Sequence, residues 1–271
     1  MTGASSGIGK EIARLLYSTN AKVYVAARSE AKCRKAIDEI QAVYPSSKGS
    51  LLFLKLDLAD LSTIKGSVEE FLSKESKLHV LFNNAGVMSV AEPPEKTVQG
   101  YEMNLGVNCL GSFLFTKLLT PVLIKTAQTA PPNTVRVVWV SSTIDLAAAK
   151  NVGIPIDNLD YHRKVGGMDR YGLSKTGNWL HAVEYARLHK ANGLISMALN
   201  PGNLYTELGR NHTAFVQWLL SFIVHPAYLG GYSLLFAGLS PKITMAETGG
   251  FRKWPDRFIT LLSSVLMMVR F

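Results

Sequence analysis

The sequence has few cysteines and no cluster of charges of one sign, and each shortage excludes a class of protein. Its two cysteines, Cys33 and Cys109, lack the spacing of metal ligands, so we expect reduced core thiols, no disulfide framework and no metal site. The 29 Lys and Arg residues outnumber the 20 Asp and Glu residues and give a formal charge of +9, but they are scattered along the chain. Because nucleic-acid binding needs a clustered basic face, we expect no nucleic-acid partner.

The sequence also shows no linker, repeat or low-complexity tract. Its C-terminal apolar run, from Phe258 to Val269, is too short to span a bilayer. A buried helix and a contact with a membrane surface both remain open for this run. No signal-peptide pattern precedes the glycine-rich loop at the N-terminus. We therefore expect a cytoplasmic protein, with peripheral membrane contact as the alternative.

Apolar strand-like runs alternate with amphipathic helical patterns along the chain. Strands are predicted at 23–27, 51–56, 78–82, 135–140 and 194–199, with a weak terminal strand near Gly250. Helices are predicted around 12–16, 33–43 and 64–72, from 99 to 125 with a kink at Pro121, and from 169 to 190. This order predicts one α/β domain over residues 1–271, built as a doubly wound parallel sheet between two helical layers. Such sheets bind ligands at the carboxyl ends of their strands.

A glycine-rich loop precedes the first helix, and its residues are Gly3, Ser5, Gly7, Ile8 and Gly9. Glycines let the backbone approach a pyrophosphate, whose charge is stabilised by the positive end of the helix. A purely structural loop is the alternative, because glycine clusters before helices are common.

Arg28 stands at the end of the strand at 23–27. A guanidinium at this point suits the 2′-phosphate of NADP(H), with Lys32 or Arg34 assisting, whereas NAD(H) would favour a carboxylate. The alternative is a solvated charge at a strand end.

Tyr171 and Lys175 are four residues apart in a predicted helix, so both side chains lie on one face. A free phenol has a pKa near 10 and is a poor base at neutral pH, but a neighbouring ammonium favours the phenolate. The pair would thus exchange a proton with a carbonyl or alcohol oxygen, although this spacing also occurs by chance.

Six elements between Thr2 and Thr206 follow the order of the short-chain dehydrogenase/reductase family and resemble it. Among them are TGxxxGxG at 2–9, NNAG at 83–86, YxxxK at 171–175 and PGxxxT at 201–206. The resemblance implies a Rossmann-type fold and an NADP(H)-dependent oxidoreductase that transfers hydride between the cofactor and a carbonyl or alcohol carbon. It implies that Ser142 holds the substrate oxygen and that Asn108 holds a water in a proton relay. The catalytic residues would be Asn108, Ser142, Tyr171 and Lys175. The cofactor-binding residues would be Gly3, Ser5, Gly7, Ile8, Gly9, Arg28, Asp57, Asn84, Tyr171, Lys175, Pro201, Gly202, Leu204 and Thr206.

Within the family, the long stretch between Ser142 and Tyr171 and the segment 235–241 resemble the retinol-dehydrogenase-like and WW-domain-oxidoreductase-like branch. This branch implies a small lipophilic substrate. The apolar, aromatic segment 203–225 is predicted to cover that substrate, with core packing as the alternative. Dimerisation through the two long helices is common in the family.

The sequence departs from the family at both ends. Only Met1 precedes Thr2, so most of the first strand is lacking. Losing three or four buried side chains would remove about 5–12 kcal/mol, comparable to the stability of a whole domain. Either the natural chain starts further upstream, or the protein is a catalytically impaired NADP-binding homologue. The tail, 251–271, does not resemble the usual ending of this branch.

Overall fold

The computed structural model describes residues 1–142, 154–202 and 226–253. All strand pairs are parallel: β2 pairs with β1, and β3, β4, β5 and β6 follow one another in that order. The strands are β1 Lys22–Ala27, β2 Ser50–Lys55, β3 Val80–Asn83, β4 Arg136–Val140, β5 Ile195–Asn200 and β6 Phe251–Lys253. Every predicted strand is confirmed, including the weak terminal one.

The segment Met1–Gly3 joins the two groups of strands. The Gly3 amide donates to the Ala26 carbonyl (2.8 Å), and the Ala26 amide donates to the Met1 carbonyl (3.0 Å). On its other side, the Thr2 amide donates to the Phe82 carbonyl (3.1 Å). This short segment therefore lies between β1 and β3, in the place of the strand that the sequence analysis finds largely missing.

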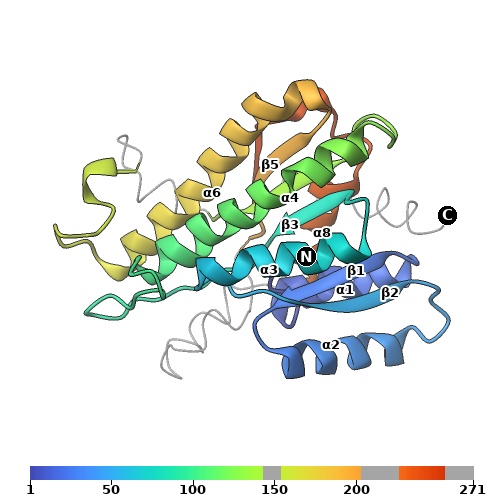
Figure 1. Cartoon of the computed structure of the whole chain (residues 1–271), viewed down its shortest axis with the longest axis horizontal. Helices are drawn as coiled ribbons and strands as arrows, with labels where there is room; N and C mark the ends of the chain where they lie inside the picture. Colours follow the sequence, from blue (N-terminus) through green and yellow to red (C-terminus); the bar gives the residue numbers. More distant parts are fainter. Residues whose placement is uncertain (143–153, 203–225, 254–271) are drawn as a thin grey trace.

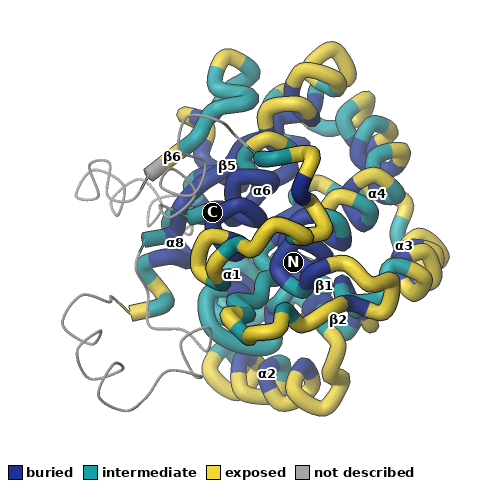
Figure 2. Tube along the Cα trace, turned by 90° about the vertical axis from the view of Figure 1, so that its left-hand side faces the viewer, coloured by how far each residue is buried: buried dark blue, intermediate teal, exposed yellow. Residues whose placement is uncertain are grey.

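Helices cover both faces of the sheet (Figure 1). They are α1 Gly7–Ser18, α2 Glu30–Val43, α3 Leu61–Lys74, α4 Ser112–Ala127, α6 Gly167–His189 and α8 Ala227–Leu239, with short turns η1 Leu105–Gly111, η2 Ile156–Asn158, η3 Lys190–Asn192 and η5 Met245–Glu247. One core cluster contains buried side chains of α1, α2 and α8, and a second contains those of α3, α4 and α6. Figure 2 shows β5, which is buried along its whole length, in dark blue. The predicted three-layer Rossmann-type fold is confirmed.

The helix predicted from residue 99 begins later than expected. Its first turn, η1, is a π-helix, and α4 continues from it with Pro121 inside the helix. The side chain of Gln99 instead accepts from the Leu61 amide (3.0 Å) and donates to Asp60 (2.8 Å), which caps α3. The apolar periodicity extends past this point, but these two hydrogen bonds hold Gln99 against the start of α3, outside the predicted helix.

Among the described residues, one helical stretch, Leu105–Ala127, is long and apolar enough to cross a membrane, and 56% of its most apolar window is buried. Leu119 and Leu123 of this stretch pack in the core cluster of α3, α4 and α6. Its composition is therefore that of a central helix of the core.

Candidate active site

The predicted site residues follow the carboxyl ends of successive strands. Arg28 follows β1, Asp57 lies just beyond β2, Asn84 follows β3, Ser142 lies just beyond β4 and Pro201 follows β5. Because the strands are parallel, these residues meet at one edge of the sheet.

The glycine-rich loop has the backbone that only glycine adopts readily. Gly3 and Gly7 have φ of 65° and 52°. A Cβ on Gly9 would lie 2.3 Å from the Gly3 carbonyl oxygen and 2.7 Å from Asn84 Nδ2. The first turn of α1 carries no acidic side chain, and within the described chain Ser6 makes no capping hydrogen bond there. The positive end of α1 therefore suits an anion such as a pyrophosphate.

Thr2 and Asn84 fix the start of this loop. The Thr2 hydroxyl accepts from the amides of Asn84 (3.0 Å) and Ala85 (2.9 Å), and Asn84 Nδ2 donates to the Thr2 carbonyl (3.0 Å). Asn84 thus braces the loop with both its backbone amide and its side chain. Thr2 is a site residue that the prediction omits, although its position before Gly3 in the family motif is a signal for it.

Arg28 and Arg34 differ in their surroundings. Arg28 is exposed and forms no ion pair with any described residue, whereas Arg34 pairs with Glu30 at 2.5 Å. Asp57 accepts a hydrogen bond from the Ala59 amide at 2.9 Å. Because the Arg28 guanidinium is exposed and the Arg34 guanidinium is already paired with Glu30, Arg28 is better placed than Arg34 to bind a phosphate.

Tyr171 and Lys175 lie on one face of α6, as predicted. Both are buried, and Lys175 Nζ lies 5.8 Å from the centroid of the Tyr171 ring. The same ammonium donates to the Val140 carbonyl (3.1 Å), at the end of β4. The Tyr171 ring therefore has the Lys175 cation as a neighbour.

Asn108 projects from the π-helical turn η1 toward the same point. Its Oδ1 accepts from the Val87 amide (2.8 Å), and its Nδ2 bonds to the Val87 carbonyl (2.9 Å) and to Ser174 Oγ (2.9 Å). A Cβ on Gly86 would lie 3.1 Å from Lys175 Nζ and 3.2 Å from Asn108 Oδ1. Lys175 and Asn108 therefore converge at Gly86. Turns of this helical type often occur at functional sites.

The two serines after β4 differ in burial. The Ser141 hydroxyl is buried and donates to the Lys175 carbonyl (2.7 Å), whereas Ser142 is half-buried. Ser141 therefore binds the backbone of α6, and Ser142 lies beside it at the same strand end.

The predicted nicotinamide seat begins after β5. Gly202 has a φ of 97°, and its amide donates to Asn200 Oδ1 (3.1 Å). Leu204, Thr206 and the predicted covering segment, 203–225, lie outside the described residues, as do residues 254–271 of the tail.

Asn108 is followed by a buried thiol. Cys109 Sγ lies 3.1 Å from His181 Nε2, and burial raises the pKa of the thiol to about 12 and lowers the pKa of His181 to about 4. Both groups are thus neutral at neutral pH. Cys33 is also unpaired and buried, and among the described residues no group of three His, Cys, Asp or Glu could hold a metal ion.

Comparison with known proteins identifies the family of this chain. A sequence profile described as "short chain dehydrogenase" matches residues 1–153. A short-chain dehydrogenase/reductase of Phomopsis amygdali is 55% identical over 247 residues, covering 90% of this chain and 73% of its own length. One of Phaeosphaeria nodorum is 48% identical over 259 residues, covering 94% and 82%. The chain belongs to the short-chain dehydrogenase/reductase family.

Solved structures support the same fold. Levodione reductase superposes with a TM-score of 0.72 at 16% identity, over 93% of both chains. An NADPH-bound carbonyl reductase from chicken fatty liver gives 0.68 at 20% identity, over 93% of this chain and 94% of its own. As a short-chain dehydrogenase/reductase, the protein is an oxidoreductase that acts on carbonyl or alcohol groups, with the NAD(P) cofactor typical of the family.

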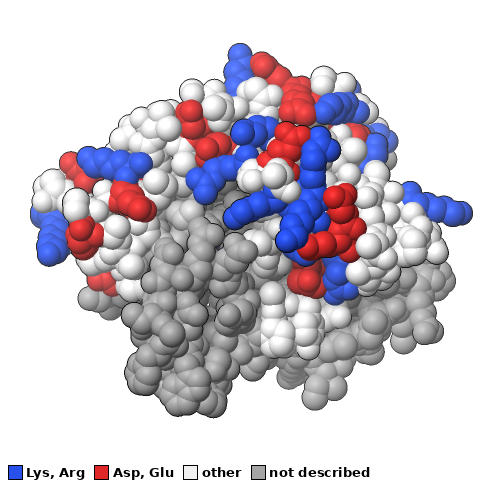
Figure 3. Space-filling model, turned by 90° about the horizontal axis from the view of Figure 1, so that it is seen from below, with Lys and Arg blue, Asp and Glu red and all other residues white. Residues whose placement is uncertain are grey.

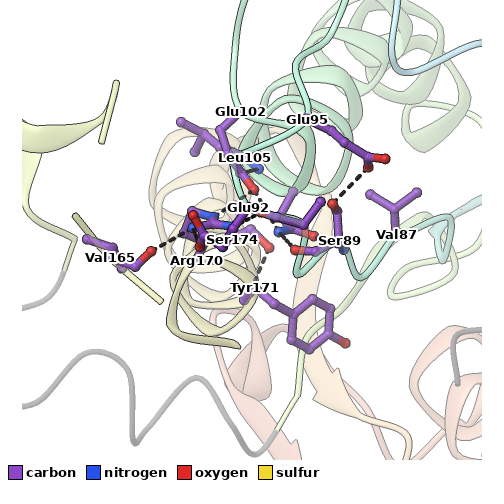
Figure 4. Close-up of polar contacts among 12 residues, drawn as sticks. Val87, Ser89, Glu92, Glu95, Glu102, Leu105, Val165, Arg170, Tyr171 and Ser174 are labelled. Atoms are coloured by element: carbon purple, nitrogen blue, oxygen red, sulfur yellow. Dashed lines mark hydrogen bonds and ion pairs between the residues drawn. The ribbon is translucent and has the colours of Figure 1, made fainter. Parts of the chain in front are cut away.

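Sequence reasoning missed the polar groups that surround the start of α6. Arg170, next to Tyr171, is only 1% exposed, and Glu102 is similarly buried. Figure 4 shows both in a cluster of hydrogen bonds and ion pairs with the loop after β3. Neither residue belongs to a family motif that the sequence analysis used, and a charged residue in a helical pattern usually predicts a solvated face.

Proposed function

We propose that this short-chain dehydrogenase/reductase transfers hydride between NADP(H) and a carbonyl or alcohol group of a small lipophilic molecule. The observation that carries the proposal is the convergence of Lys175 and Asn108 at Gly86, with the Tyr171 ring beside the Lys175 ammonium. Ser142, at the end of β4, would hydrogen-bond the substrate oxygen and stabilise its developing charge.

The protein's own groups would handle the proton. The dinucleotide, when bound, supplies or accepts the hydride at its nicotinamide ring. Tyr171 would give its phenolic proton to the substrate oxygen in reduction and take one in oxidation. The Lys175 cation would stabilise the phenolate, and Asn108 would hold a water that returns the proton. The glycine-rich loop and the start of α1 would bind the pyrophosphate.

Turnover against a panel of lipophilic ketones and aldehydes tests this proposal. We expect NADPH oxidation that depends on the carbonyl compound and is faster with apolar than with polar substrates of equal size. Binding of NADPH without turnover of any carbonyl or alcohol would instead support the catalytically impaired homologue.

Two exposed apolar side chains support a lipophilic substrate. Val90 and Met168 are 44% and 43% exposed. Gly167, next to Met168, packs so closely on Val90 that a Cβ there would lie 2.6 Å from the Val90 Cα. Val90 therefore packs against the start of α6, where Met168 lies three residues before Tyr171. The resemblance to the retinol-dehydrogenase-like branch points to the same class of substrate.

Arg28→Glu should separate the two cofactors. The exposed guanidinium at the end of β1 suits a 2′-phosphate, so we expect the KM for NADPH to rise about 10- to 100-fold while that for NADH changes little. Arg34→Glu is the matched control, because Arg34 pairs with Glu30 and should affect neither cofactor strongly. Equal effects of Arg28→Glu on both cofactors would place Arg28 outside the phosphate site.

We also propose a partner and a location for the protein. Exposed apolar side chains on the two long helices, such as Phe113 and Leu180, support a homodimer formed through α4 and α6.

On the face in Figure 3, basic and acidic side chains are interspersed, which favours a small-molecule partner over nucleic acid. We propose a cytoplasmic location. Membrane contact through the C-terminal run stays a prediction, since that run lies outside the described residues.

A further inference from the structure

Residues 87–92 follow the turn after β3, and buried polar side chains bond this segment along one side. Asn108 bonds both the amide and the carbonyl of Val87, at 2.8 and 2.9 Å. Asn104 does the same for Ser89, at 2.8 and 2.7 Å. Side chains thus bond alternate residues of this segment, as a neighbouring strand would bond a strand in a sheet.

Arg170 extends this series to the next alternate residue. Its Nη2 donates to the Ala91 carbonyl (2.8 Å), and its Nη1 donates to Glu92 (2.7 Å) and to the Val165 carbonyl (2.6 Å). The guanidinium holds the pKa of the Glu92 carboxyl below its usual value. Arg170 therefore ties the segment to the start of α6, as the close-up in Figure 4 shows.

Glu102 connects Arg170 to the other anchors. Its carboxylate lies 3.4 Å from Arg170 Nε, with exposed fractions of 4% for Glu102 and 1% for Arg170. The same carboxylate accepts from Asn104 Nδ2 (2.7 Å) and from the Leu105 amide (2.8 Å) at the start of η1. One buried network thus spans the segment, η1 and α6.

Both ends of this network reach the site. Arg170 directly precedes Tyr171, and Asn108, at the far end, meets Lys175 at Gly86. Between them, the close contact of Gly167 with Val90 leaves no room for α6 to shift toward the segment. A change in the length or direction of the Arg170 contacts would therefore displace the start of α6, immediately before Tyr171.

We propose that Arg170, held by Glu102, is a positioning residue that sets the place of Tyr171 against Lys175 and the bound substrate. This inference rests on the proposed function of Tyr171. The role requires the planar fork of arginine, because a single ammonium cannot reach Ala91, Glu92 and Val165 together.

Arg170→Lys tests the proposal, since it keeps the buried charge beside Glu102. In the full chain we expect retained folding and an unchanged Kd for NADPH, with kcat lowered about 10- to 100-fold by misplacement of the phenol. The matched control, Arg187→Lys, changes an exposed arginine of the same helix that pairs with Glu184, and should leave kcat unchanged. The double variant Arg170→Met/Glu102→Met, which leaves no unpaired buried charge, should show the same loss of kcat.

A second readout does not depend on turnover. The difference in tyrosinate absorbance between the protein and its Tyr171→Phe variant reports the titration of Tyr171 with NADP⁺ bound. In the Arg170→Lys background we expect this titration at higher pH, because the phenol lies less well against the Lys175 cation. If the parent protein shows this titration but reduces no carbonyl compound, the proposed function fails while the positioning role stands.

A purely structural role predicts a different pattern. Arg170→Lys would then lower the midpoint of thermal unfolding, while kcat per folded molecule and the Tyr171 titration would match the parent protein. That result would overturn the proposal.

Discussion

Tyr171→Phe is expected to lower kcat by about 1,000-fold or more while the protein still binds NADPH, because general acid–base catalysis contributes roughly 10²–10⁴ and the substrate oxygen also loses its hydrogen bond. The ring is buried and keeps its place beside Lys175, so the variant removes the hydroxyl and little else. Steady-state turnover together with cofactor titration by protein fluorescence would separate the two effects.

Tyr101→Phe provides the control for this variant. Tyr101 is 44% exposed and lies in the loop before η1, so loss of its hydroxyl should leave turnover unchanged. Turnover by Tyr171→Phe at the parent rate would mean that the proton comes from another group, and the roles given to Lys175 and Asn108 would have to be revised.

Gly9→Ala is expected to raise the Kd for either cofactor about 100-fold or more, since the loss of several phosphate contacts costs roughly 3 kcal/mol. The added Cβ would lie 2.3 Å from the Gly3 carbonyl oxygen and 2.9 Å from the Ala4 Cα. Both are backbone atoms of the loop, so the loop must shift to accept the methyl group. Calorimetric titration with NADPH would measure the loss.

Gly66→Ala is the matched control for that variant. Gly66 lies in α3, and apart from its chain neighbours and the backbone of its own helix, no described atom lies within 4 Å of the Cβ that the substitution would add. We expect unchanged cofactor binding and a gain of about 0.5–1 kcal/mol in the free energy of unfolding, because alanine favours the helix. If Gly9→Ala bound NADPH as tightly as Gly66→Ala does, the glycine-rich loop would not be the phosphate site.

The strand-end positions of the site could be predicted from the sequence because the rule behind them is local. Apolar runs predict the strands, and parallel pairing then brings Arg28, Asn84 and Ser142 to one edge. The spacing of Tyr171 and Lys175 likewise follows from the helical repeat. For these residues, the sequence immediately around them is enough to predict which strand end or helix face they occupy.

The anchoring network could not be predicted, since its contacts join residues far apart in the chain. Arg170 and Glu92 are 78 residues apart. Charged side chains in helical patterns usually face solvent, so nothing in the pattern around Arg170 indicates burial. The late start of the helix after Gln99 has the same origin, because the side chain of Gln99 accepts a hydrogen bond from the Leu61 amide, 38 residues earlier in the sequence.

The short segment Met1–Gly3 makes the cofactor loop part of the seam between the two halves of the sheet. Its backbone bonds to Ala26 on one side and to Phe82 on the other, and the loop continues directly from it. A dinucleotide that binds only the folded loop would therefore hold β1 and β3 together as well, since ligand binding stabilises whatever structure it requires. Binding of the dinucleotide and the pairing of the two halves of the sheet would therefore be coupled, so that each stabilises the other.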